Sequence, residues 1–260
     1  MWHEQNAGVA GIDVYRRNES GDWRYVWTGI PRNATNAYLS CKWLGGEGKV
    51  NFPLYNGIVE LEIATKAGGV ELLPPRTEKP IVVYGTSITQ GCGATRPGMS
   101  HVNIMGRLLD TPVVNLGFSG SGKMEAEMVD TVAATDAQCY VLDTVWNMGG
   151  ALINKNCESF VRALRKKRPG VPIVMCEGCI AFRSPQLRKG MEGANAAWRK
   201  VYDTLKAEDP KEWANLVYVS DLDYGPDGET AVDGCHANDW GMMKMGRAFA
   251  EGVRKALGKK

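Results

Sequence analysis

The sequence has little net charge and no long hydrophobic run, and each of these absences excludes a class of protein. Its 31 basic and 29 acidic residues leave a net charge of +2, which is too small to favour nucleic acid or an anionic lipid surface as a partner. No apolar run approaches the roughly 18–20 residues that span a bilayer, so we expect no membrane segment. The first four residues show neither the basic nor the apolar region of a signal peptide. We expect a cytoplasmic protein as the chain is written, or a periplasmic or secreted one if a leader has been removed.

The seven cysteines are an odd number in a chain of 260 residues, so at least one thiol must be free. A reducing compartment is the simpler interpretation. Cys176 and Cys179 have the C-x-x-C spacing of redox and zinc sites, but no second such pair and no nearby pair of histidines completes four zinc ligands. We interpret them as small apolar residues at a strand end, with a functional role as the alternative, and expect neither a metal nor a cofactor.

The first 76 residues show strand patterns and no helical period of comparable strength. Residues 11–15 and 23–27 flank the turn-forming segment 18–22, which predicts a hairpin. Residues 59–63 alternate apolar and acidic side chains, which predicts a further strand. These patterns predict a small β-sandwich-like domain over residues 1–76.

Trp23, Tyr25 and Trp27 share one face of a predicted strand, and two interpretations fit them. Aromatic side chains in such a row could stack on sugar rings, or they could form the core of the small domain. We favour the core, because large aromatic side chains are so often buried. Residues 71–80 then carry three prolines and no periodicity, which indicates a linker.

From residue 81 onward the pattern changes to alternating strands and helices, which predicts a second domain over residues 77–260. Five short apolar or β-branched runs recur between stretches with helical spacing: 81–84, 112–116, 140–143, 172–175 and 216–219 for the strands, and 124–134, 159–167 and 186–206 for the helices. This order predicts a parallel sheet with helices on both faces. Right-handed crossovers bring the carboxyl ends of the strands to one edge, where ligands bind in such sheets.

The segments at that edge carry the residues of one possible chemistry. Ser87 follows the first strand, and Asp233 and His236 share a loop before the last helix. A serine hydroxyl becomes a nucleophile when a base takes its proton, and His236 alone among the three histidines has a carboxylate three residues earlier in the same loop. We predict Ser87 as the nucleophile, His236 as the base and Asp233 as the group that orients the imidazole.

Two further segments could supply an oxyanion hole. Gly120 lies in a glycine-rich loop after the second strand, and Asn147 follows the third. The backbone N–H groups of Ser87 and Gly120, with the side-chain amide of Asn147, are predicted to hold the oxyanion. Without these partners, Asn147 would be interpreted as a turn former at a strand end.

Three more residues are candidates for the substrate pocket. Thr86 precedes the serine, and Trp146 precedes Asn147, where it could wall an acyl pocket. His101 lies at a predicted helix start, where a structural histidine is favoured over a second base. His3 is expected to be a mobile terminal residue.

As a set, these segments resemble the SGNH (GDSL-type) hydrolase superfamily over about residues 80–258. The resemblance rests on Gly-Thr-Ser-Ile-Thr at 85–89, Gly120, Asn147 and Asp-Gly-Cys-His at 233–236. It implies a flavodoxin-like three-layer α/β/α fold with a five-stranded parallel sheet, and ester hydrolysis through an acyl-enzyme without a metal. Gly-Ile-Asp-Val-Tyr at 11–15 resembles the GxDLY-like signature of a small β domain that precedes certain bacterial members, which act mostly on acyl esters, often of carbohydrates.

The chain departs from the common family pattern at three positions. Thr86 stands where aspartate is usual, Trp146 where glycine is usual and Met148 where aspartate is common. None of these changes removes a member of the predicted catalytic set. They place the chain in a divergent branch of the superfamily.

The residues and the resemblance together predict a serine esterase that acts on a short-chain acyl ester, with an acetyl ester of a carbohydrate as the favoured substrate. One alternative is an esterase or thioesterase that acts on small acyl metabolites in the cytoplasm. The other is a carbohydrate-binding protein that has lost activity. The expected partner is a small-molecule or carbohydrate ester, with no nucleic acid and no membrane, and a homo-oligomer is possible.

Overall fold

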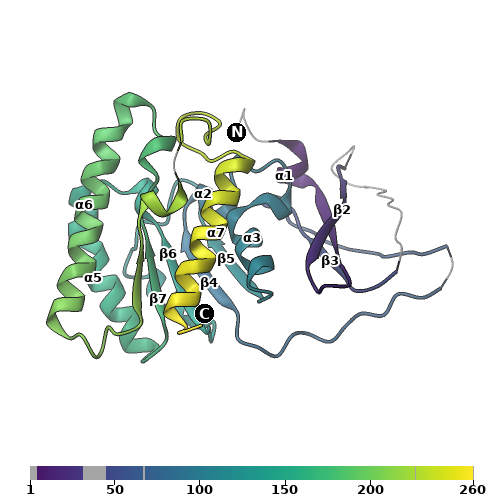
Figure 1. Cartoon of the computed structure of the whole chain (residues 1–260), viewed down its shortest axis with the longest axis horizontal. Coiled ribbons are helices and arrows are strands. Elements are labelled where there is room, and N and C mark those ends of the chain that lie inside the picture. Colours follow the sequence, from purple (N-terminus) through teal and green to yellow (C-terminus); the bar gives the residue numbers. More distant parts are fainter. Residues whose placement is uncertain (1–4, 32–44, 67, 226, 260) are drawn as a thin grey trace.

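A five-stranded parallel sheet forms the centre of the protein (Figure 1). The computed structural model describes residues 5–31, 45–66, 68–225 and 227–259. The strand order is β5-β4-β6-β7-β8, and the strands are β4 (Ile81–Gly85), β5 (Val113–Gly117), β6 (Cys139–Asp143), β7 (Ile173–Cys176) and β8 (Leu216–Val219). All five predicted strands are confirmed, each to within one residue at either end. The predicted α/β fold class is confirmed with them.

Helices cover both faces of this sheet, as predicted. They are α2 (Ser87–Gln90), α3 (His101–Leu108), α4 (Met128–Ala134), α5 (Gly150–Lys167), α6 (Pro185–Glu208) and α7 (Asp239–Ala256). Short 3-10 helices follow several strands or precede helices: η1 (Pro97–Met99), η2 (Val145–Asn147), η3 (Ile180–Phe182) and η4 (Asp221–Tyr224). Helices α3 and α7 pack together on one face, and α5 and α6 pack together on the other (Figure 1).

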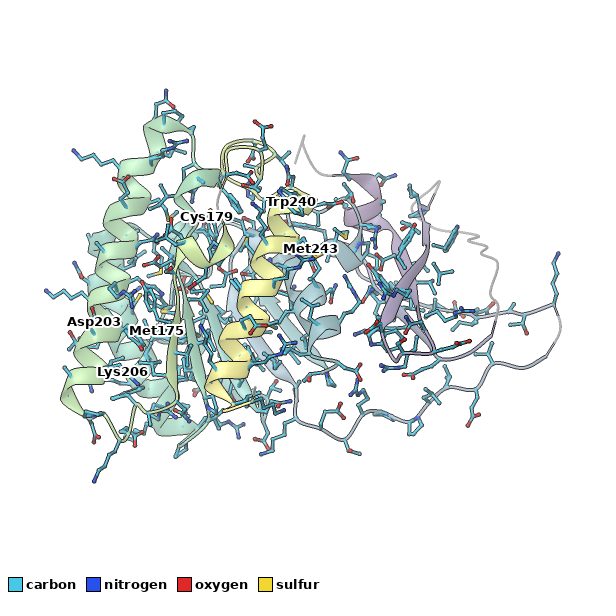
Figure 2. All side chains as sticks on the ribbon, in the orientation of Figure 1. Met175, Cys179, Asp203, Lys206, Trp240 and Met243 are labelled. Carbon is cyan, nitrogen blue, oxygen red and sulfur yellow. The ribbon has the colours of Figure 1, made fainter. Side chains whose placement is uncertain are left out.

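The helix α5 begins nine residues earlier than its sequence pattern predicted. Its buried side chains Ile153, Cys157, Phe160 and Leu164 follow helical spacing along the whole element. The two glycines at 149–150 hide its start, because glycine is a poor helix former. Helix α6 likewise has one face toward solvent, where Asp203 is exposed, whereas Met175 of the neighbouring sheet is fully buried (Figure 2).

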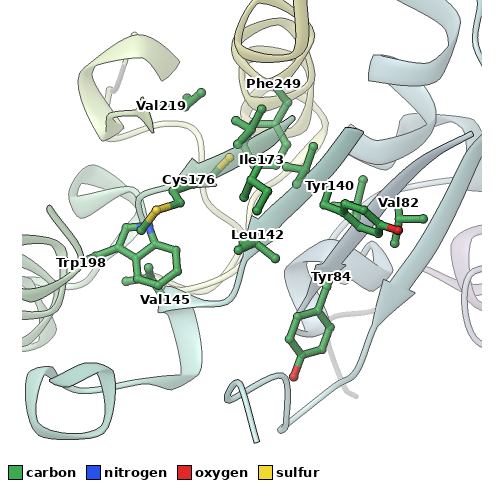
Figure 3. Packing of buried hydrophobic residues seen from close by; sticks show 14 of the residues in the cluster. Val82, Tyr84, Tyr140, Leu142, Val145, Ile173, Cys176, Trp198, Val219 and Phe249 are labelled. Atoms are coloured by element: carbon green, nitrogen blue, oxygen red, sulfur yellow. The ribbon is translucent and has the colours of Figure 1, made fainter. Parts of the chain in front are cut away.

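The core lies on both faces of the central strands, and for this reason these strands are apolar except at their carboxyl ends. Trp198 of α6 and Phe249 of α7 are fully buried and pack on the sheet from opposite faces (Figure 3). Leu142 and Ile173 lie between them in adjacent strands. Within the described residues, no helix is long and apolar enough to cross a membrane.

A small antiparallel sheet precedes the large one. It has the order β2-β1-β3, with β1 at Ile12–Arg17, β2 at Trp23–Gly29 and β3 at Gly48–Asn51, and a short helix α1 (Asn6–Ala10) leads into it. The predicted hairpin is confirmed, since the N–H of Asn18 donates to the carbonyl of Asp22 at 2.9 Å. In the part of the chain described, the predicted sandwich is a single sheet of three strands.

The strand predicted at residues 59–63 is wrong. These residues form no strand, and Val59, Leu61 and Ile63 are 45% exposed or more. Alternation shows that a segment could line one face of a sheet, but a strand also needs a neighbour to pair with. The segment 71–80, predicted as a linker, contains neither helix nor strand. His3 lies outside the described residues.

The aromatic side chains on β2 are partly exposed, and two of them contact residues that lie before and after α3. Trp23 donates to Asp110, Tyr25 is 49% exposed beneath the guanidinium of Arg96, and Trp27 is half-buried. The favoured interpretation, that these three residues form the core of the small domain, is therefore wrong, because none of them is buried.

The acidic residue of the motif at 11–15 joins the two sheets. Asp13 is fully buried and accepts hydrogen bonds from Arg96 at 2.6 Å, from the backbone N–H of Gly98 at 2.8 Å and from Asn51 at 2.8 Å. Arg96 also donates to the hydroxyl of Tyr15. The motif thus binds the loop that leads into α3.

Asp110, at the end of α3, makes a second connection between the sheets. It accepts hydrogen bonds from Arg17 at 3.0 Å and Trp23 at 2.9 Å, and Arg76 donates to it at 3.2 Å. Burial alone would raise the pKa of this carboxyl, but these donors outweigh burial and lower the pKa to about 2. The charged carboxylate is therefore the form that holds the sheets together.

We expect Asp110→Asn to lower the melting temperature by about 2–4 °C at pH 7, the size of about 1 kcal/mol in a chain of this length. A carboxylate with a lowered pKa stabilises the fold above its unfolded pKa near 4, and this contribution is lost as the pH falls toward about 2. Asparagine tolerates the left-handed backbone at this position, where φ is 46°. Calorimetry at pH 7 and pH 2.5 measures the difference, with the exposed Asp130→Asn as the control. An equal difference at both pH values would contradict the assignment.

Candidate active site

Ser87 lies at the carboxyl end of β4, as the first residue of α2. Thr86 caps this helix, because its hydroxyl accepts from the N–H of Ile88 while its own N–H donates to the hydroxyl of Thr89. A threonine therefore serves as the N-cap where the common family motif has aspartate. Gly85 must lack a side chain, since a Cβ there would lie 1.9 Å from the Thr89 hydroxyl. This turn aims the serine away from the strand.

Ser87, His236 and Asp233 form a chain of hydrogen bonds. Ser87 Oγ lies 3.0 Å from His236 Nε2, and His236 Nδ1 lies 2.8 Å from Asp233 Oδ2. Ser87 is 7% exposed, so most of the residue is shielded from solvent. The topology thus brings together two residues that are 149 positions apart in the sequence.

The carboxylate of Asp233 also organises the loop that carries the histidine. Its Oδ1 accepts from the backbone N–H groups of Cys235 at 2.9 Å and of His236 at 2.7 Å. Burial raises the pKa of Asp233, but the hydrogen bonds and charge of His236 outweigh burial and leave the pKa below its ordinary value. Asp233 is therefore a carboxylate at neutral pH, the form that can accept from Nδ1–H and stabilise an imidazolium.

The glycine-rich turn after β5 lies beside the serine. The N–H of Phe118 donates to the carbonyl of Gly85, and Gly122 packs so closely on Gly85 that a Cβ would lie 2.2 Å from that carbonyl oxygen. Gly120 has φ of 74° and open space where a side chain would project. Gly120 is therefore the glycine of this turn that leaves open space around its Cα.

Asn147 ends η2, directly after β6. Its Nδ2 donates to the carbonyl of Ser121 at 2.7 Å, which fixes the amide against the glycine-rich turn. A side-chain amide has two N–H donors, so one remains for a ligand. The structure brings Ser87, Gly120 and Asn147 to one edge of the sheet, on the turns that follow β4, β5 and β6.

The three predicted pocket residues are buried behind this edge. Thr86 and His101 are fully buried and Trp146 is 6% exposed. Burial does not fit a pocket-lining role for Thr86 and His101, which have no surface to offer a substrate. Trp146 stacks on Phe182 with ring centroids 5.9 Å apart, in the core as much as at the site.

Sequence reasoning missed Asp143, the residue around which these side chains gather. This fully buried carboxylate ends β6 and accepts from Trp146 Nε1 at 2.7 Å and from the Thr89 hydroxyl at 2.7 Å, with His101 Nε2 at 3.1 Å. The signal was an aspartate at the end of an otherwise apolar strand, because a buried carboxylate requires several donors. Asp143 thereby connects α2, α3 and η2.

Cys176 and Cys179 are buried free thiols. Burial raises the pKa of Cys179 to about 11 and that of Cys176 well above its usual value, so both are protonated at neutral pH. Protonated thiols are neither nucleophiles nor metal ligands. Among the described residues, no group of three or more histidine, cysteine, aspartate or glutamate side chains is placed to hold a metal ion.

Comparison with known proteins identifies the family. Residues 78–254 match the GDSL-like lipase/acylhydrolase family, and residues 1–69 match the GxDLY N-terminus of SGNH-hydrolase-type esterases. The chain belongs to the GDSL-like lipase/acylhydrolase family, whose members are hydrolases of the carboxylic ester type. The predicted family is confirmed. No curated protein matches the chain.

Solved structures share the fold. A protein from Bacteroides ovatus described as a GDSL-like lipase is 30% identical, with a TM-score of 0.87 over 100% of this chain and 78% of that one. The salicylyl-acyltransferase SsfX3 of a tetracycline biosynthetic pathway is 18% identical, with a TM-score of 0.68 over 96% and 73%. A family two carbohydrate esterase from Clostridium thermocellum, solved with cellohexaose, is 13% identical, with a TM-score of 0.67 over 98% and 88%. The last two show likeness of fold alone.

Proposed function

We propose that this acylhydrolase is a serine esterase for short-chain acyl esters, acetyl esters of carbohydrates in particular. Ser87 is its nucleophile, His236 its general base and Asp233 the group that orients the base. The observation that carries the proposal is the continuous hydrogen-bond chain from Ser87 Oγ through both ring nitrogens of His236 to Asp233.

The first half of the reaction transfers the acyl group to the enzyme. His236 Nε2 takes the hydroxyl proton as Ser87 Oγ attacks the ester carbonyl carbon. The electron pair of the carbonyl bond moves to its oxygen, which accepts from the N–H groups of Ser87 and Gly120 and from Asn147 Nδ2. The tetrahedral intermediate then collapses, and the alcohol leaves with the proton from His236.

The second half releases the acid. A water molecule gives a proton to His236 Nε2 and attacks the acyl carbon, and the new oxyanion lies in the same site. Collapse breaks the bond to Ser87 Oγ, which takes the proton back from His236. The carboxylic acid leaves and the enzyme returns to its starting state.

The connections around Ser87 support a short acyl group. In the described chain, β4 to β8 are joined by helices and short loops, with no separate helical lid above the serine. A long acyl chain gains binding energy by burying its methylene groups, at about 0.8 kcal/mol each, and needs an apolar groove to do so. Trp146, the large apolar side chain next to Asn147, is already packed in the core.

An exposed aromatic side chain supports a carbohydrate as the alcohol part. Trp240 is 53% exposed at the start of α7, four residues after His236 (Figure 2). Its exposed indole face offers an apolar platform for a sugar ring, while its N–H is hydrogen-bonded to Asp227. Lys244 Nζ lies over the same ring, 5.2 Å from its centroid.

Acyl-chain length is the experiment that tests the substrate. We expect kcat/KM for p-nitrophenyl acetate to exceed that for the octanoate ester at least about tenfold, with the butyrate ester between them. Acetylated xylo-oligosaccharides should then release acetate. A preference for octanoate would contradict the short-chain proposal, and a preference for acetyl thioesters would favour the small-metabolite alternative. Saturable binding of a polysaccharide without hydrolysis would favour the binding protein.

A further inference from the structure

Arg183 contacts both loops that carry the proposed polar groups of the site. It follows η3, and its guanidinium donates from Nη2 to the carbonyl oxygen of Trp146 at 3.0 Å and from Nη1 to Cys235 Sγ at 2.6 Å. Trp146 directly precedes Asn147, and Cys235 directly precedes His236. One side chain therefore holds the neighbours of the proposed oxyanion donor and of the proposed base.

The residues beside Arg183 strengthen both contacts. The N–H of Ser184 donates to the carbonyl of Gly234 at 3.0 Å, in the loop of His236. The guanidinium also lies over the Trp146 ring, 5.5 Å from its centroid, and Phe182 stacks on the same ring. The segment 182–184 thus connects the two loops by side chains and by backbone.

Stability alone does not account for an arginine at this position. The residue is 9% exposed, and removing a guanidinium from water costs several kcal/mol unless a strong acceptor compensates. Within the described part of the chain Arg183 makes no ion pair, and one of its two acceptors is a thiol, which is a weak acceptor. Arg165 offers the contrast, since it is also buried and lies over Trp213 but has Glu212 at 3.4 Å.

We propose that Arg183 is a positioning residue that fixes Asn147 and His236 relative to one another, and so sets the distance between oxyanion donor and base on either side of Ser87. The proposal rests on the proposed function of these residues. Arg183 itself touches no reacting atom. A displacement of such groups by about 1 Å weakens their stabilisation of the transition state far more than the binding of the substrate. Loss of Arg183 should therefore lower kcat and leave KM nearly unchanged.

Arg183→Met is the variant that tests this. We expect kcat for p-nitrophenyl acetate to fall about 100-fold with KM within about twofold of wild type. Arg183→Lys should lose nearly as much, because an ammonium group lacks the two-pronged geometry that bonds both loops. Arg165→Met is the matched control: it removes a buried guanidinium from a tryptophan ring at the far end of α5, and should lower the melting temperature while keeping kcat.

Two further experiments keep the test decisive if Arg183→Met folds poorly. Cys235→Ala removes one side of the contact and should lower kcat by a smaller factor, with no further loss when combined with Arg183→Met. Added methylguanidinium should restore part of kcat in Arg183→Ala and none in Arg165→Ala. Multiplicative losses for Cys235→Ala and Arg183→Met, or equal effects of methylguanidinium on both alanine variants, would overturn the inference.

The same assay separates this inference from the proposed function. Wild type and Ser87→Ala are measured beside the Arg183 variants. If wild type and Ser87→Ala do not differ, the proposed function fails and the inference fails with it. If they differ while Arg183→Met keeps the wild-type kcat, or loses activity only in proportion to its unfolded fraction, the inference alone is overturned.

Discussion

Ser87→Ala is expected to lower kcat for p-nitrophenyl acetate by about 10⁶-fold, the loss typical of a removed serine nucleophile. His236→Ala should lose about as much, because a serine hydroxyl without its base is a weak nucleophile and the two residues act as a unit. Both variants should keep the wild-type circular dichroism spectrum and melting temperature within a few degrees, since neither Ser87 nor His236 belongs to the hydrophobic core.

Asp233→Asn should be milder, with a loss of about 10⁴-fold. An asparagine amide facing Nδ1 donates a hydrogen bond where the carboxylate accepts one, so it favours the imidazole tautomer that has its proton on Nε2. That nitrogen then has no lone pair for the proton of Ser87. The oxygen of asparagine still accepts from the backbone N–H groups of Cys235 and His236, so the loop keeps its shape.

A second serine variant controls for hydrolysis that does not depend on Ser87. Ser100→Ala, at the buried N-cap of α3, provides a serine variant prepared in the same way whose hydroxyl has a helix-capping role. It should keep the wild-type kcat. Esterase activity of Ser87→Ala at the wild-type level would show that the hydrolysis occurs elsewhere, and equal losses for Asp233→Asn and His236→Ala would contradict the separate roles given to them.

The sequence predicted the large sheet better than the small one, for a physical reason. Strands β4, β6 and β7 are buried on both faces, so each is a continuous apolar run with sharp ends. Residues 59–63 carry an equally clear alternation, yet no described strand pairs with them. A local pattern shows that a segment could form a strand, whereas its pairing depends on a second segment that is distant in the sequence.

The residues of the candidate site also differ in whether the sequence could reveal them. Asp233 and His236 are three positions apart, so their pairing could be predicted from one loop, and Ser87 joined them through the topology of a parallel sheet. Arg183 was missed because both its acceptors come from other segments, and Asp143 because two of its three partners, Thr89 and His101, are 54 and 42 positions away. The acceptors of Arg183 are 37 and 52 positions away, and no spacing rule connects them. Buried polar groups with distant partners become visible only in the folded structure.

Asp143→Ala is expected to cause the largest loss of stability among single substitutions at the site, about 3–5 kcal/mol. The fully buried carboxylate accepts from Trp146 and Thr89 and lies 3.1 Å from His101 Nε2. Removing it leaves these buried donors without their acceptor, and each unsatisfied donor costs about 1–3 kcal/mol. Urea unfolding followed by circular dichroism measures the change in the free energy of unfolding.

Asp136→Ala is the matched control for this substitution. Asp136 lies just before β6, the strand that Asp143 ends, and pairs with Lys79 at 2.9 Å. Its side chain is 57% exposed, so its loss should cost at most about 1 kcal/mol. A cost for Asp143→Ala as small as that of Asp136→Ala would show that the donors find other acceptors. A large cost would show that this one carboxylate holds α2, α3 and η2 together. Two of its partners are close to the site in the sequence, since Thr89 lies two residues after Ser87 and Trp146 one residue before Asn147. The stability of the edge that carries the proposed nucleophile and oxyanion donor then depends on a group that touches neither the substrate nor solvent.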